Sequence, residues 1–227
     1  MHAVARTSFS VGAIGAGRVE AIAGARHAWR FRPHFHTGDE VVQVLAGRAR
    51  LQLRDAGREV AAGDIVVVPA GVLHRFEPID DRGWAFRSRF VPSAASPAIR
   101  GVLGARVAAL LAGRPSLHTD VEAIARACAM SAGHLARAFR RETGTSLHNF
   151  HVLLALHKAK ARLRDGAPII ETALDAGFCD QAHLNREFVK TFGLTPATFR
   201  AGWATSDQAE SDPSSSAMYH VPGTGLS

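Results

Sequence analysis

The sequence contains little cysteine and no long apolar segment. Two cysteines, Cys128 and Cys179, occur among 227 residues, and their spacing fits neither a metal-binding motif nor a disulfide framework. No apolar run approaches the roughly 20 residues that a membrane-spanning helix needs. The first residues carry scattered charges without a sustained apolar core, so a secretory signal is not expected. These absences favour a protein of the reducing cytoplasm, associated with the nucleoid if it binds DNA, and with no membrane partner.

The charge of the chain suits a polyanionic partner but does not locate a binding site. The formal net charge is +7, and hydrophobic residues make up 47% of the chain. Most of the excess positive charge falls before residue 120, outside the segment that carries the strongest motif. Net charge alone therefore supports nucleic-acid binding only weakly. The length allows two small domains, each with its own core.

Residues 124–146 and 172–196 repeat one pattern. His134-Leu135-x-Arg137-x-Phe139 in the first copy corresponds to His183-Leu184-x-Arg186-x-Phe188 in the second. Each copy has the layout of a helix, a tight turn and a second helix, which indicates a helix-turn-helix unit.

The spacing within the second helix of each copy separates a buried face from an exposed one. The apolar residues that lie four apart, and so share one face, are Leu135, Phe139, Leu184 and Phe188. Arg137 and Arg186 point away from that face, where a guanidinium can meet both acceptors of a guanine edge. Ser131 and Asp180 are suited to cap these helices. One such arginine is usually a solvated charge, but two at matched positions of a repeat favour DNA contact.

With these motifs, residues 117–203 resemble the AraC/XylS family of bacterial transcription regulators, including the closing segment GLTPATFR at 193–200. The resemblance implies two helix-turn-helix subdomains joined by a long helix and bound to successive major-groove segments of one DNA face. The implied DNA-contacting positions are Gly133, His134, Ala136 and Arg137 in the first copy, and Gln181, Ala182, Asn185 and Arg186 in the second. The first copy is expected to read bases mainly through Arg137, with His134 on the backbone, and the second to supply more specificity. Ala129 stands where the family usually has a turn glycine.

From about Arg18 to Pro92 the pattern changes to short alternating or apolar runs separated by turns, which is typical of an all-β domain. Runs at 41–45, 49–54 and 65–68 end at turn signals such as Asp55-Ala56-Gly57. Strands at this close spacing predict a small barrel or a jelly roll of two sheets.

Two segments of this region resemble the cupin family. They are His34-x-His36-x3-Glu40-x6-Gly47 and Gly63-x5-Pro69-x-Gly71-x2-His74. The resemblance implies that His34, His36, Glu40 and His74 converge inside the barrel. Three imidazoles and a carboxylate form an open site for one divalent Fe, Mn, Ni or Zn ion. The alternative is that these side chains hydrogen-bond to an effector or to one another without metal.

The connecting segments carry further expectations. An amphipathic helix is predicted around residues 99–111, packed on the barrel or paired with a second subunit. A long helix is predicted at 146–165, and the cations of its second half could touch phosphates or compensate the helix dipole. These cations are Lys158, Lys160, Arg162 and Arg164. The tail after Trp203 lacks a hydrophobic period and is expected to be disordered.

The sequence therefore predicts an α+β multidomain protein. The expected parts are a cupin-like sensor barrel at 1–92, a linker helix at 93–116, a tandem helix-turn-helix domain at 117–203 and a tail at 204–227. The predicted function is sequence-specific transcription regulation in response to a small molecule or metal, without catalysis. The alternative is a metal-dependent cupin enzyme, a dioxygenase or isomerase, with a DNA-binding appendage. The expected partners are double-stranded promoter DNA and an effector of unknown identity, with a second copy of the chain and RNA polymerase as further candidates.

Overall fold

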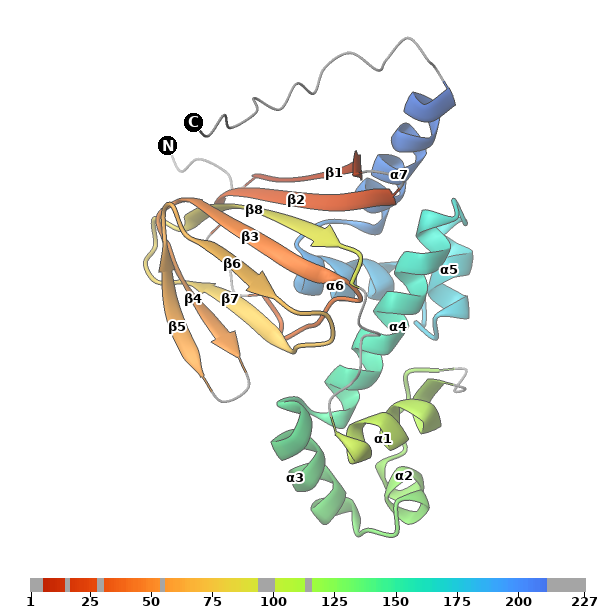
Figure 1. The fold of residues 1–227 in the computed structure, drawn as a ribbon. Helices are drawn as coiled ribbons and strands as arrows, with labels where there is room; N and C mark the ends of the chain where they lie inside the picture. Colours follow the sequence, from red (N-terminus) through yellow and green to blue (C-terminus); the bar gives the residue numbers. More distant parts are fainter. Residues whose placement is uncertain are drawn as a thin grey trace.

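The computed structural model describes residues 6–14, 17–27, 31–53, 56–93, 101–112 and 116–211. Within these ranges a set of β-strands is followed by a set of helices, as expected. Figure 1 shows the strands as one β domain, with α4, α6 and α7 beside it and α1 to α3 extending away from it. None of the described helices is long and apolar enough to cross a membrane.

Two antiparallel sheets form the β domain. The strands are β1 (Arg6–Ile14), β2 (Gly17–His27), β3 (Asp39–Ala46), β4 (Arg48–Leu53), β5 (Gly57–Ala61), β6 (Ile65–Val68), β7 (His74–Pro78) and β8 (Trp84–Val91). One sheet has the order β1-β2-β8-β3-β6, and the other has the order β5-β4-β7. Alternate residues point inward, as Val42 and Val44 of β3 do at 0% and 1% exposure, because side chains of a strand alternate between its faces. The expectation of a cupin-like double sheet is confirmed.

Strand β1 was not anticipated, because the expected β region began near Arg18. β1 pairs with β2 along its whole length, and its Phe9 ring lies 4.9 Å from the ring of Phe199 in the last helix. The first strand and the last helix therefore pack against each other.

The helices contain two similar halves. They are α1 (Val102–Ala112), α2 (Val121–Ala127), α3 (Ala132–Thr143), α4 (Leu147–Arg164), α5 (Ile169–Asp175), α6 (Gln181–Phe192) and α7 (Pro196–Ser211). The pairs α2–α3 and α5–α6 are the two helix-turn-helix units, and α4 joins them (Figure 1). α7 continues past Trp203 to Ser211, which corrects the expectation that the tail is disordered from residue 204. The rest of the expected tail, 212–227, lies outside the described residues.

The turns of the two helix-turn-helix units contain the same backbone hydrogen bond. The Met130 amide donates to Ala125 O after α2, and the Phe178 amide donates to Ala173 O after α5, each at 2.9 Å. This bond spans a residue in the left-handed conformation, which is typical of a helix C-terminus. Gly177 takes that conformation in the second turn (φ 92°), but Ala129 takes it in the first (φ 56°). A Cβ makes this conformation unfavourable, so the first turn is strained.

Helix α1 packs on the first helix-turn-helix unit. Val107 and Leu111 are buried at 0% and 2% exposure in a cluster with Leu135 and Phe139 of α3 and Leu153 of α4. Of the two expected packings, the one on the barrel is wrong, because the apolar face of α1 is covered by α3 and α4, while pairing with a second subunit stays a prediction.

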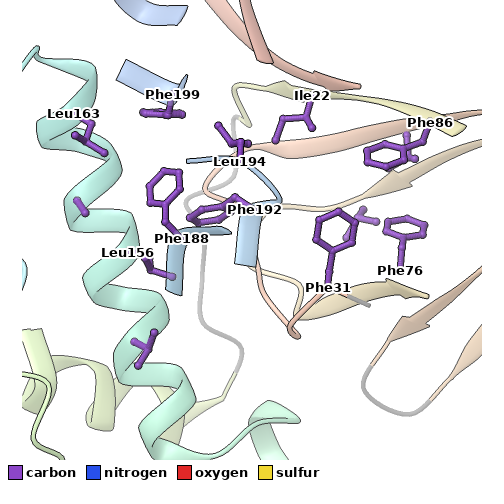
Figure 2. Packing of buried hydrophobic residues seen from close by; sticks show 14 of the residues in the cluster. Ile22, Phe31, Phe76, Phe86, Leu156, Leu163, Phe188, Phe192, Leu194 and Phe199 are labelled. Carbon is purple, nitrogen blue, oxygen red and sulfur yellow. The ribbon is translucent and has the colours of Figure 1, made fainter. Parts of the chain in front are cut away.

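A second cluster joins the barrel to the other helix-turn-helix unit. Figure 2 shows Phe188 and Phe192 of α6 between Leu156 of α4 and Phe31 of the barrel. Burial of each large apolar side chain contributes about 1.5–3 kcal/mol, so this continuous cluster holds the barrel against α4, α6 and α7.

Candidate functional site

The positions expected to contact DNA are all at the surface. Gly133, His134, Ala136 and Arg137 on α3 and Gln181, Ala182, Asn185 and Arg186 on α6 are exposed. The opposite faces of the same helices are buried, and their apolar side chains are 0% exposed: Leu135, Phe139, Leu184 and Phe188. Each helix thus buries one face and presents the other, as the spacing predicted.

The N-termini of α3 and α6 are capped as expected. Ser131 Oγ accepts a hydrogen bond from the His134 amide at 3.3 Å, and Asp180 Oδ1 accepts one from the His183 amide at 2.6 Å. The glycine at 133 leaves room for its neighbour on the same face, because a Cβ there would lie 3.3 Å from Arg137 Nη1. The Arg137 guanidinium can therefore lie over the first turn of α3.

The cations of α4 pair within the molecule. Lys160 Nζ and Arg164 Nη2 donate to the two carboxylate oxygens of Glu20 on β2, each at 2.7 Å. The other two bind Asp175 on α5: Arg162 pairs with its carboxylate at 2.7 Å, and Lys158 Nζ donates to its backbone oxygen at 2.5 Å. The suggestion that these side chains touch phosphates is thus corrected for Lys160, whose side chain is 13% exposed at the seam with the barrel.

Glu20 is the centre of this seam, and sequence reasoning missed it. Burial acts to raise the pKa of the carboxyl, but the ion pairs and hydrogen bonds with Lys160 and Arg164 outweigh it and hold the pKa at about 2. Trp203 Nε1 of α7 also donates to it, at 3.3 Å. The sequence signal was an acidic residue on the same strand face as the apolar Ile22.

The four cupin-type residues converge inside the barrel. The possible ligand nitrogens of His34, His36 and His74 lie within 4.8 Å of one another, and all three residues are buried. Glu40, which is 5% exposed, joins them: its Oε2 lies 2.8 Å from His74 Nε2 and 3.4 Å from His36 Nε2. His34 comes from the segment before β3, Glu40 from β3 and His74 from β7, so both sheets hold the cluster.

The hydrogen bonds around the cluster fix which nitrogen atoms face inward. Nδ1 of His34 lies 2.7 Å from Arg32 O, and Nδ1 of His74 lies 3.0 Å from Val72 O. A carbonyl oxygen only accepts, so each Nδ1 carries the proton. In a neutral ring Nε2 then presents a lone pair, and that of His74 faces a Glu40 oxygen. The contact of 2.8 Å between His74 Nε2 and Glu40 Oε2 is a hydrogen bond when Nε2 carries a proton, and a bound cation would take the place of that proton. Carbonyl-oriented imidazoles are usual around bound metals, so the residues fit a divalent ion.

The surroundings of the cluster also favour the protonation states that a metal requires. Burial, with the neighbouring imidazoles, holds the pKa of His34 well below its usual value, and burial lowers the pKa of His36 although Glu40 opposes this. Burial acts to raise the pKa of Glu40, but His36 and His74 outweigh it, so that this pKa lies well below its usual range. A carboxylate and neutral imidazoles are the ligand forms for a metal ion.

The barrel interior beside this cluster is almost full. The cavity among His34, His36, Glu40, Phe76 and Phe192 measures about 20 Å³, which is space for about one water molecule. Phe31 and Phe76 line it, whereas the ring of Phe35 stacks on the ring of His157 of α4, with 4.7 Å between the ring centroids.

A larger groove lies between the barrel and the first helix-turn-helix unit, with a volume of about 730 Å³. Its lining is mostly apolar and includes Leu51, Val66, Leu73, Thr143 and Phe150. Pockets of this size are typical of small-molecule sites.

The architecture defines the class of the protein as a cupin-like barrel joined to a tandem helix-turn-helix domain. A family model described as AraC-like ligand binding domain matches residues 17–162, more than half of the chain, and a model described as helix-turn-helix domain matches residues 124–202. The chain therefore belongs to the AraC family, which is the family expected from its sequence.

Individual relatives match more locally. The chain is 31% identical over 86 residues to the arabinose operon regulatory protein of Salmonella typhimurium, covering 37% of this chain and 31% of that protein. It thus spans about a third of the length of this relative. It is 37% identical over 51 residues to the acireductone dioxygenase of Drosophila pseudoobscura pseudoobscura, covering 20% of this chain and 27% of the enzyme. The fold is similar to ToxT of Vibrio cholerae, with a TM-score of 0.55 over 88% of this chain and 99% of ToxT at 8% identity.

Proposed function

We propose that the protein is a sequence-specific DNA-binding transcription regulator whose cupin-like domain senses a small molecule or a metal. The observation that carries the proposal is the repeated display of a capped helix with an exposed arginine on α3 and again on α6. Membership of the AraC family supports it, as does the likeness to an arabinose operon regulatory protein. A second copy of the chain and RNA polymerase are further proposed partners.

In this proposal the exposed faces of α3 and α6 enter successive segments of the major groove. Arg186 and Asn185 have the planar donors and acceptors that read base edges, whereas Gly133 and Ala136 have none. The capped helix N-termini also carry amides and a partial positive charge that suit phosphate oxygens. The second unit would therefore supply more of the sequence specificity than the first.

The DNA assignment is tested with fragments recovered from genomic DNA by the purified protein. Arg186→Ala should weaken specific binding by about 1–3 kcal/mol and relax the preference at one base position, as measured by fluorescence anisotropy and a gel-shift series. Arg50→Ala, which removes an exposed arginine from β4, is the matched control and should change affinity much less. Unchanged affinity and sequence preference in Arg186→Ala would reject the assignment.

The metal proposal is one divalent Fe, Mn, Ni or Zn ion held by His34, His36, His74 and Glu40. The bound ion would supply a positive charge that neutralises the buried carboxylate and fixes the imidazoles in one arrangement. Elemental analysis of the purified chain and calorimetric titration with Mn²⁺, Ni²⁺ and Zn²⁺ test it. His36→Ala should lower the affinity by at least about tenfold, whereas the exposed His118→Ala should not change it. Equal metal content in all three proteins would contradict the assignment.

The groove of about 730 Å³ is the proposed place for a small-molecule effector, because the interior cavity of about 20 Å³ cannot hold one. A molecule in the groove would touch Leu51 of the barrel and Phe150 of α4 together. It would shift the DNA-binding equilibrium by no more than its difference in affinity for two arrangements of these parts.

A metal-dependent enzyme is the second candidate, since a segment of this chain is similar to acireductone dioxygenases. That likeness covers 20% of the chain, and the family match favours the regulator. A substrate screen with the metal-loaded protein separates the two: turnover that disappears in His36→Ala would favour the enzyme, and metal binding without turnover would favour the sensor.

A further inference from the structure

The segment that brings His34 and His36 into the cluster also contacts both α4 and α6. Asn149 Nδ2 of α4 donates to Pro33 O at 3.3 Å, and His157 Nε2 of α4 donates to Phe35 O at 3.0 Å. Residues 31–36, which we call the histidine segment, are therefore tied to the DNA-binding part by their own backbone.

The contact of this segment with α6 lies beside the proposed base-reading residues. The Arg32 amide donates to Lys190 O at 3.2 Å, and the Arg32 guanidinium pairs with the Glu187 carboxylate. The side chains of this ion pair are 16% and 17% exposed, so water screens it only partly. Glu187 directly follows Arg186 in the sequence and is one turn of helix before Lys190. A displacement of Arg32 would therefore act on the turn of α6 that contains Arg186.

An aromatic contact reaches α6 from the cluster itself. The ring of Phe192, the last residue of α6, lies 6.2 Å from the ring of His34 and 6.4 Å from that of His36. Figure 2 shows Phe192 at the border between α6 and Phe31 of the barrel. The histidines therefore touch the end of α6 directly, in addition to the hydrogen bonds made by their segment.

Metal binding would change the geometry of the histidine segment. The ligand nitrogens of His34, His36 and His74 spread over up to 4.8 Å. Nitrogens that bind one first-row ion lie closer together than this, so the rings would have to move inward. Packed interiors transmit such movements because they contain few voids, and the adjacent cavity is only about 20 Å³.

We propose that the histidine segment couples occupancy of the cluster by a divalent ion to the affinity of α6 for DNA, with Arg32 as the positioning residue. The inference rests on the proposed function, both for the ion and for DNA. Coupling between two binding sites is reciprocal, so DNA changes the affinity for the ion by the same factor as the ion changes the affinity for DNA.

The experiment uses the untagged full chain, Ni²⁺ as the ion and a DNA fragment selected by either the metal-free or the Ni²⁺-loaded protein. The ratio of DNA affinities with and without saturating Ni²⁺ should differ from 1 by at least about fivefold in the wild type. Arg32→Glu places two carboxylates together and should bring this ratio to within about twofold of 1. The exchanged pair, Arg32→Glu with Glu187→Arg, should restore the coupling. Because each ratio compares one protein with itself, general effects of the changed charge on DNA affinity cancel.

Two controls keep the outcome decisive. Glu187→Gln removes the ion pair without altering the histidine segment and should also bring the ratio closer to 1, which guards against misfolding of Arg32→Glu. Arg50→Glu makes the same charge reversal on an exposed strand and should leave the ratio unchanged. Calorimetry should give all these variants the same Ni²⁺ affinity within about threefold, since none alters a ligand.

A wild-type ratio near 1, despite tight binding of both Ni²⁺ and DNA, would overturn the coupling. Full coupling retained in both Arg32→Glu and Glu187→Gln would overturn the role of Arg32. Failure of the proposed function appears at an earlier step, as no Ni²⁺ binding in calorimetry or no DNA selected by either the metal-free or the Ni²⁺-loaded protein. Either result would overturn the inference as well, but would be recognised before any ratio is measured.

Discussion

The ion pairs of Glu20 provide a quantitative test of how the barrel is held to the helices. Glu20 on β2 is 6% exposed, and its carboxylate binds Lys160 and Arg164 of α4. Glu20→Gln keeps the shape of the side chain but removes its charge, which leaves the largely buried Lys160 without a counter-ion. Breaking a buried pair in this way is destabilising, because the remaining charge is poorly solvated.

The pKa of Glu20 sets the size of the effect. A fall from the ordinary value of 4.5 to about 2 corresponds to about 3 kcal/mol, at about 1.4 kcal/mol per unit. Since the folded pKa is depressed, this stabilisation is fully present above pH 4.5 and is lost as the pH falls towards 2. We expect Glu20→Gln to lower the free energy of unfolding by about 3 kcal/mol at pH 7 and by about 1 kcal/mol at pH 3.

Urea denaturation followed by circular dichroism at pH 7, 5, 4 and 3 measures this difference. Glu59→Gln is the control, because the Glu59–Arg48 pair lies at the surface with side chains 47% and 53% exposed. Exposed pairs contribute little, so this variant should differ from the wild type by less than about 1 kcal/mol. A loss below about 1 kcal/mol at pH 7 for Glu20→Gln, or a loss that does not shrink towards pH 3, would refute the reasoning.

Two further predictions concern the helix-turn-helix units. Ala129→Gly should stabilise the protein by about 1 kcal/mol in urea denaturation, because a left-handed Ala costs about 1–2 kcal/mol. The larger conformational entropy that glycine loses on folding offsets part of this stabilisation. The reverse change in the second turn, Gly177→Ala, should destabilise it, since φ is 92° and the added Cβ would lie 3.2 Å from Ser116 Cα; equal effects of both changes would contradict this explanation. Asp180→Ala should cost about 1 kcal/mol by removing the cap of α6, while Asp180→Asn should cost less; a loss in the Asn variant as large as in the Ala variant would argue against the capping role.

The reading helices could be predicted from the sequence because their signals are local. The spacing of Leu184 and Phe188 defines a buried face of α6, and Asp180 defines its start, with partners within a few residues. The same holds for the alternation in β3. The cupin-type ligands were expected from the resemblance of two segments to the cupin family, whereas the hydrogen bonds that orient the imidazoles depend on how the strands pair.

The tertiary structure alone decided which surfaces these elements bury. Nothing in the local sequence indicates that Lys160 binds Glu20 across 140 positions, that α1 packs on α3, or that Arg32 reaches Glu187. Spacing along the chain determines which residues share the face of one helix or strand, because the backbone repeats at fixed intervals. Contacts between elements depend instead on how whole faces pack together, and that packing places Lys160 and Arg164 of α4 in the seam with the barrel, where they bind Glu20.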